Sequence, residues 1–139
     1  MRYMGLDFGS KTVGVALSDP LGLTVYGLEI IRRTEETHLR RTLRRIEEIA
    51  GEYEVEAIVL GYPLNMDDSV GERAEKTLAF RDQLVSRLHL PVYMSDERLT
   101  TVAAEENMAE RGIRREDYKK YVDRVAASII LEDWIGAHS

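Results

Sequence analysis

Four acidic residues in three separate segments are the chain's best candidates for chemistry. Asp7 lies in the segment MGLDFGS, Asp96 and Glu97 lie in YMSDERLTT, and Asp123 lies in VDRVAA. Carboxylates 4 Å apart at an effective dielectric constant of 20 repel each other by about 4 kcal/mol per pair, so a cluster of them requires a hard divalent cation. The pattern therefore predicts a site for one or two Mg²⁺ ions, with Mn²⁺ able to substitute, of the kind used in phosphoryl transfer.

The composition limits the kind of metal site and the compartment. The chain has 139 residues, no cysteine and three histidines without paired ligand spacing, which excludes a thiolate zinc site, a thiol nucleophile and a disulfide framework. No apolar run approaches the roughly 20 residues of a membrane span, and the N-terminus lacks a signal-peptide pattern. We therefore expect a cytoplasmic protein with one domain over residues 1–139 and no membrane contact.

The basic residues are concentrated in two stretches, although the net charge is −6. Such a charge argues against a protein that coats nucleic acid in general, because phosphate binding by such proteins usually requires an excess of basic residues. The first stretch is most simply the solvated face of an amphipathic helix, whereas the second flanks Asp123 and is more suggestive of function. The first comprises Arg32, Arg33, Arg40, Arg41, Arg44 and Arg45, and the second comprises Arg111, Arg114, Arg115, Lys119, Lys120 and Arg124.

The elements that must position these residues follow a mixed pattern. Hydrophobic periodicity and turn signals predict strands over 3–9, 12–18, 23–31, 57–61 and 91–95, and helices over 39–50, 70–88, 99–111 and 119–136. Three successive strands followed by alternating helices and strands indicate an α/β fold with three layers, in which a mixed five-stranded sheet has helices on both faces. Ligands of such sheets gather at strand ends.

Each acidic residue also has a purely structural explanation. Asp7 interrupts an apolar strand, where it could accept hydrogen bonds from the backbone or an arginine instead of binding a cation. Asp96 and Glu97 precede a helical pattern and could cap it. Because neighbours on an extended segment point in opposite directions, only one of them is expected to face the site, and we favour Glu97. Asp123 could be a first-turn aspartate, but the alanines after it would let its helix approach the sheet closely.

Four motifs in this order resemble the YqgF (RuvX) family over essentially the whole chain: MGLDFGSKTVGVALSD, VLGYPLNMD, SDERLTT and VDRVAASIIL. The resemblance implies a ribonuclease H-like fold, similarity to Holliday junction resolvases and a role as a nuclease that matures precursor 16S ribosomal RNA. It assigns the family's acidic residues to Asp7, Glu97 and Asp123, with Asp96 and Arg98 completing the middle motif. Asp96 stays a candidate metal ligand beside Glu97. Two departures from the family's pattern, Tyr62 and Asp68, affect the expected shape of one loop.

We therefore expect a metal-dependent endonuclease whose partner is structured RNA or branched DNA. The residues expected to contact nucleic acid are Ser10, Lys11, Asn65, Arg73, Arg98, Lys119 and Lys120. A Holliday junction resolvase is one alternative, and it would require a homodimer, whereas trimming an RNA end would not. A non-catalytic nucleic-acid-binding module is another. A phosphotransferase of the actin and sugar-kinase type fits the first motif, but the chain lacks the second domain that such enzymes close around a nucleotide.

Overall fold

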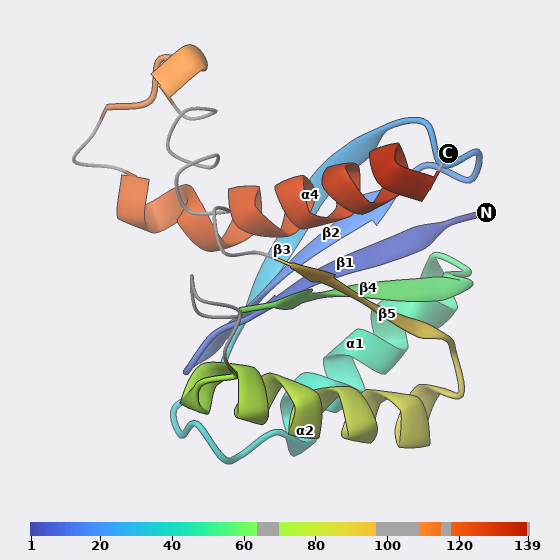
Figure 1. Ribbon diagram of the computed structural model, residues 1–139, viewed down its shortest axis with the longest axis vertical. Coiled ribbons are helices and arrows are strands. Elements are labelled where there is room, and N and C mark those ends of the chain that lie inside the picture. Colours follow the sequence, from blue (N-terminus) through green and yellow to red (C-terminus); the bar gives the residue numbers. More distant parts are fainter. Residues whose placement is uncertain (64–69, 97–108, 115–117, 139) are drawn as a thin grey trace.

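A single five-stranded sheet forms the centre of the protein in the computed structural model (Figure 1). The structure describes residues 1–63, 70–96, 109–114 and 118–138, with only the backbone described for 118–125. The strand order is β3-β2-β1-β4-β5. Three strands form an antiparallel meander, and β4 is parallel to both β1 and β5. The strands are β1 (Tyr3–Phe8), β2 (Thr12–Ser18), β3 (Val25–Arg32), β4 (Ala57–Tyr62) and β5 (Val92–Asp96).

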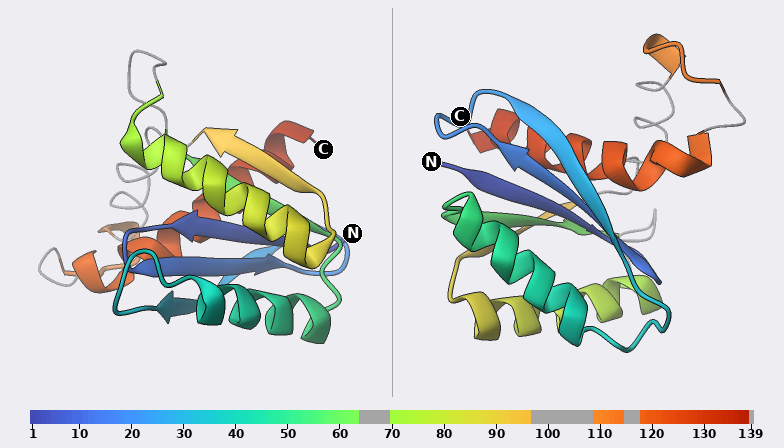
Figure 2. Two further views of the ribbon diagram at one scale, coloured as in Figure 1. Left: turned by 90° about the horizontal axis from the view of Figure 1, so that it is seen from below. Right: turned by 180° about the vertical axis from the view of Figure 1, so that it is seen from behind.

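Helices cover both faces of this sheet. α1 (Arg40–Glu52) and α2 (Glu72–Leu88) lie side by side on one face, and α4 (Tyr118–His138) crosses the other (Figure 2). The expected three-layer α/β fold with a mixed five-stranded sheet is confirmed. The boundaries of these strands and helices differ from the expected ones by at most two residues. The predicted helix over 99–111 falls mostly outside the described residues.

The main core lies between the sheet and the pair α1 and α2. Alternate residues of β1, namely Met4, Leu6 and Phe8, point into it and are nearly or completely buried, as the two-residue period of a strand requires. The ring of Phe8 stacks on that of Phe80 from α2, with centroids 4.1 Å apart. This aromatic pair fixes α2 against the end of β1.

The layer under α4 is thinner because a glycine faces the helix. A Cβ atom on Gly5 would lie 2.8 Å from the Leu131 Cβ and 2.9 Å from the Ala127 carbonyl oxygen. Only glycine permits this approach without displacing the helix. The small side chain predicted to bring the last helix close to the sheet, Ala127, is completely buried at this contact.

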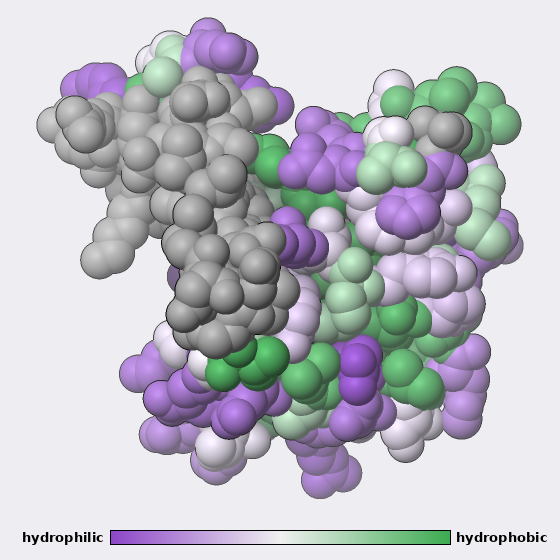
Figure 3. Space-filling view, in the orientation of Figure 1, coloured by the Kyte–Doolittle hydropathy of each residue, from purple (hydrophilic) through white to green (hydrophobic). Residues whose placement is uncertain are grey.

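The surface is largely polar between scattered apolar residues. In Figure 3 hydrophilic side chains gather along the lower edge, over α2, and hydrophobic ones lie at the upper right, over the β2–β3 turn and the end of α4. The turn contributes Leu21 and Leu23, which are strongly exposed. Among the described helices, none combines the length and the apolar character needed to cross a membrane.

Candidate active site

The carboxyl ends of four strands meet at one edge of the sheet. β4 is parallel to β1 and β5, and β3 runs in the direction of β1 because both are antiparallel to β2. This edge, called here the carboxyl edge, carries the last residues of β1, β3, β4 and β5, which are Phe8, Arg32, Tyr62 and Asp96. In open α/β sheets this is where ligands bind.

Asp7 lies next to the carboxyl edge, on the face covered by α4. Side chains alternate along β1, so Asp7 shares a face with Tyr3, which packs in the α4 layer. Leu6 and Phe8 belong to the core on the other face. Asp7 is half-buried, so its carboxylate is neither sealed in the core nor fully solvated.

The two strands beside Asp7 present glycines to it. Its partner on β2 is Gly14. On β4, the register that pairs Leu6 with Leu60 brings Gly61 next to Asp7. Neither cross-strand neighbour therefore has a side chain that would cover the Asp7 carboxylate.

α4 carries position 123 toward the same edge. The Tyr3 ring contacts the Trp134 ring, with centroids 5.2 Å apart, and Gly5 lies against Ala127. Residue numbers therefore rise along β1 as they fall along α4, and the two elements are antiparallel (Figure 1). Asp123 precedes Ala127 by four residues, or about 6 Å of helix. Its backbone thus lies closer to the carboxyl edge than Ala127 does.

Asp96 ends β5 on the opposite face of the sheet from Asp7. The Tyr93 ring stacks on Trp134 of α4, with centroids 4.8 Å apart, whereas Met94 packs against the main core. By alternation Asp96 shares the face of Met94. Asp7 and Asp96 therefore lie at the same edge, with β4 between their strands, but on opposite faces of the sheet.

Several of the predicted site residues lie outside the part of the chain whose side chains the structure describes. Within the described ranges, no three histidine, aspartate or glutamate side chains form a group that could hold a metal ion. The residues outside these ranges are Asn65, Glu97 and Arg98, and the side chains of Lys119, Lys120 and Asp123 are likewise outside what the structure describes.

The β1–β2 turn beside Asp7 is a tight hairpin with exposed polar residues. The Gly9 amide donates to the Thr12 carbonyl oxygen at 2.7 Å, and Ser10 and Lys11 are exposed. Arg33, the residue after β3, holds this turn. Its guanidinium Nη2 donates to the Gly9 carbonyl oxygen at 2.7 Å, and its backbone amide donates to the Lys11 carbonyl oxygen at 2.9 Å.

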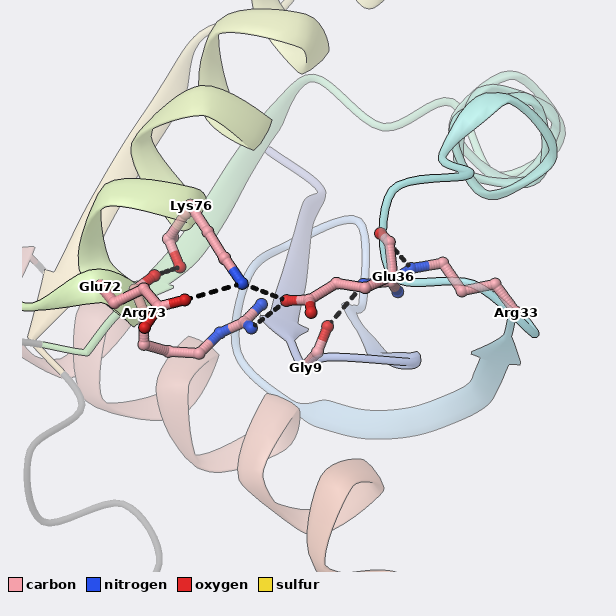
Figure 4. Close-up of polar contacts among 7 residues, drawn as sticks. Gly9, Arg33, Glu36, Glu72, Arg73 and Lys76 are labelled. Atoms are coloured by element: carbon pink, nitrogen blue, oxygen red, sulfur yellow. Dashed lines mark hydrogen bonds and ion pairs between the residues drawn. The ribbon is translucent and has the colours of Figure 1, made fainter.

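An arginine pair lies under the same edge, on the face opposite Asp7. The guanidinium carbons of Arg33 and Arg73 lie 5.0 Å and 4.8 Å from the centroid of the Phe8 ring. Glu36 accepts hydrogen bonds from Lys76 at 3.0 Å and from Arg73 at 2.8 Å (Figure 4). These two donors lower the pKa of Glu36. Burial, and secondarily the positive charge of Arg73, lowers the pKa of Arg33.

Sequence reasoning identified Arg73 but missed its partners Arg33 and Glu36. Arg73 was predicted to contact nucleic acid, and the structure places it at the start of α2, already paired with Glu36. Three buried nitrogens of this pair, Nη1 of Arg33 and Nε and Nη2 of Arg73, have no hydrogen-bond partner in the described structure. The only signal for Arg33 in the sequence is its place in the first basic stretch, because its contacts with the β1–β2 turn and with Phe8 are to residues distant in the chain.

The sequence matches the family described as "RuvX: Holliday junction resolvase" over residues 1–137. The chain belongs to the RuvX family. Similar relatives include a protein of Agathobacter rectalis, 58% identical over 97% of this chain and 94% of its own length, and one of Myxococcus xanthus, 47% identical over 99% of this chain and 89% of its own length. Both carry the name "Putative pre-16S rRNA nuclease". The expected family and the nuclease class are thereby confirmed.

Solved structures similar to this RuvX-family protein include RuvC and a viral Holliday junction resolvase. RuvC of Thermus thermophilus, solved with a Holliday junction substrate, aligns with a TM-score of 0.60 over 100% of this chain and 97% of its own, at 14% sequence identity. The fowlpox virus Holliday junction resolvase aligns with a TM-score of 0.57 over 99% of both chains, at 15% identity. At such low identity these structures establish the fold, which is ribonuclease H-like.

Proposed function

We propose that this RuvX-family protein is a metal-dependent endonuclease that hydrolyses phosphodiester bonds in the maturation of the 5′ end of precursor 16S ribosomal RNA. The observation that carries the proposal is the half-buried Asp7 at the carboxyl edge, between two glycine neighbours and on the face that α4 covers. The names of the relatives support the RNA substrate.

The residues present fit a hard divalent cation. The chain has no cysteine, and carboxylate oxygens are the protein ligands that Mg²⁺ prefers. We assign the ligands to Asp7, Glu97 and Asp123. Asp96 is a weaker candidate because it ends β5 on the face opposite Asp7. A bound Mg²⁺ or Mn²⁺ would activate water and stabilise the charge that develops on the phosphate.

The chain's own groups would orient the substrate around these acids. Ser10 and Lys11, exposed in the turn that follows β1, can contact a phosphate next to the one that is cut. Asn65, Arg98, Lys119 and Lys120 remain proposed contacts on the strength of the sequence. Arg73 is also kept as a proposed contact, although its guanidinium already pairs with Glu36.

Holliday junction resolution is the second candidate function. It is favoured by the description of the family and by the junction-bound RuvC structure that this fold resembles. A resolvase that cuts two strands symmetrically would act as a homodimer, whereas an RNA-trimming enzyme can be a monomer. A protein that stays monomeric with a junction bound would contradict this second candidate.

Cleavage of two labelled substrates tests the proposal. Precursor 16S ribosomal RNA and a four-way DNA junction are each incubated with Mg²⁺, Mn²⁺ or a chelator, using the wild-type protein. We expect metal-dependent cutting of the RNA at its 5′ side. Preferential cutting of the junction would support the second candidate, and binding of either substrate without any cutting would indicate a non-catalytic module.

A further inference from the structure

The first basic stretch, expected to be a solvated helix face, divides into two parts. Arg45 donates to both carboxylate oxygens of Glu29, at 2.9 Å and 2.6 Å, and lies 3.5 Å from Glu48. Its neighbour Arg44 is exposed on the same helix. These two arginines therefore match the expected solvated face.

The other four arginines surround a hollow of about 540 Å³ between the end of β3 and the start of α1, called here the basic hollow. Five of its six described lining residues are arginine or histidine, and none of the six is acidic. Ion pairs and side-chain hydrogen bonds are absent from Arg32, Arg40 and Arg41 as far as the described ranges extend. The lining residues are Arg32, Arg33, Thr34, His38, Arg40 and Arg41.

The start of α1 adds to the positive potential of the basic hollow. α1 begins at Arg40, has no acidic residue in its first turn and has no side-chain cap. The unpaired amides at a helix start carry a partial positive charge, which normally selects acidic residues there. Two consecutive arginines at this position raise the electrostatic free energy unless an anion lies nearby.

Arg33 connects the basic hollow to the candidate active site. It lines the hollow, and its Nη2 atom donates to Gly9 in the turn that follows Asp7. Its Nη1 atom is buried and lacks a hydrogen-bond partner in the described part of the chain. β3 and β1 are two strand spacings apart, or about 10 Å, and Arg33 lies on the face of the sheet opposite Asp7, so a strand that contacts both must pass around the carboxyl edge.

We propose that the basic hollow binds the phosphodiester backbone of a nucleic acid that passes around the carboxyl edge from Asp7. The path of the strand across the carboxyl edge rests on the proposed function. Binding at the hollow rests on the structure, through the positive charge of the hollow, its volume and its arginine donors without partners among the described residues. The hollow thus positions the substrate and takes no part in the bond cleavage.

Salt-dependent binding tests this inference without measuring cleavage. A fluorescein-labelled RNA hairpin with single-stranded extensions is titrated in KCl and chelator, with anisotropy as the readout. The test variant is Arg40→Gln/Arg41→Gln. Its matched control is Arg44→Gln/Arg45→Gln, which makes the same charge change on the same helix. We expect the slope of log K against log salt to fall in magnitude by about 1.4 for a single-stranded contact, or about 1.8 for a duplex contact, in the test variant alone.

The outcomes separate this inference from the nuclease proposal. The inference about the hollow is wrong if both double variants give equal slopes, or if the wild-type protein binds no RNA in low salt. It is also wrong if the hollow binds inorganic pyrophosphate tightly while the slope for RNA is unchanged in the test variant. If the test variant loses slope while the wild-type protein cuts no substrate, the hollow is supported and the nuclease proposal fails. If Mg²⁺-dependent cutting occurs and the slopes are equal, the nuclease proposal is supported and the inference about the hollow fails.

Discussion

At the scale of single residues, Asp7 is the group on which the proposed chemistry depends. We expect Asp7→Asn to lower the cleavage rate by more than about 100-fold. Mutation of a residue that only hydrogen-bonds to a metal ligand already lowers metal affinity or activity by about 10- to 100-fold, and Asp7 is proposed as a ligand itself. The fold should persist, and the melting temperature in chelator should be unchanged or higher, since one repelling carboxylate is lost. Single-turnover cleavage and thermal unfolding measure the two effects.

A remote aspartate provides the control for this variant. Asp82 is exposed on α2 and pairs with Arg81 at 3.1 Å. Asp82→Asn makes the same chemical change and should leave cleavage unaltered. Unfolding of Asp7→Asn would show that Asp7 stabilises the fold and would refute its assignment as a metal ligand.

The Glu29–Arg45 pair makes part of the stability depend on pH. The hydrogen bond from Arg45 lowers the pKa of Glu29 below its ordinary value of 4.5. A lowered folded-state pKa stabilises the protein above the unfolded value, and this contribution is lost as the pH falls through the folded value. Both side chains are about a third exposed, so Glu29→Gln should cost no more than about 1 kcal/mol at pH 7.

Urea unfolding at pH 7 and about pH 3 checks the sign of this effect. The difference between Glu29→Gln and the wild-type protein should be present at neutral pH and vanish in acid. Glu52→Gln is the control, because Glu52 is exposed at the end of α1 and the described structure gives it no ion pair. A difference that stays constant with pH would contradict the assignment.

At the scale of secondary structure, the contact between β1 and α4 sets where position 123 lies. A Cβ atom at position 5 would stand 2.8 Å from the Leu131 Cβ, so we expect Gly5→Ala to push α4 away from the sheet. Overpacking of this kind costs about 1–3 kcal/mol. Cleavage should fall more than stability alone explains, because the proposed ligand Asp123 moves with the helix. Urea unfolding and cleavage assays at a temperature where the variant is folded test this.

Gly51 offers a matched substitution elsewhere. It lies in α1, and no heavy atom lies within 4 Å of the Cβ position that alanine would occupy. Gly51→Ala should be neutral or stabilising by up to about 1 kcal/mol, from helix propensity, and should not affect cleavage. If Gly5→Ala behaves in the same way, close packing of α4 is not what positions the site.

At the scale of the whole molecule, the predicted single domain over residues 1–139 implies one cooperative unfolding transition. Phe80 is completely buried and stacks on Phe8. Phe80→Ala should lower the free energy of unfolding by about 3–5 kcal/mol while the transition stays two-state. Calorimetry gives the test: the calorimetric and van't Hoff enthalpies should agree. A separate early transition for α4 would contradict the single domain.

The sequence by itself determined the types and order of the elements, and it predicted the chemistry of the site. Period-two and helical hydrophobic patterns are local, so the strands ending near Phe8 and Asp96 and the helix containing Ala127 could be predicted closely. Asp7 could be singled out in the same way, because an acidic residue that interrupts an apolar strand is also a local pattern. The four motifs then gave the family, because their order spans almost the whole chain.

Only the tertiary structure decided which of these residues are neighbours. The sheet separates Asp96 from Asp7, because the packing of Tyr93 on α4 fixes which face each residue of β5 occupies. One basic stretch contains both an ion pair to Glu29 and a hollow at Arg40, because folding brings β3 against α1. Hydrophobic periodicity is a property of a single segment, whereas charge pairing and burial depend on contacts between segments, and these exist only after folding.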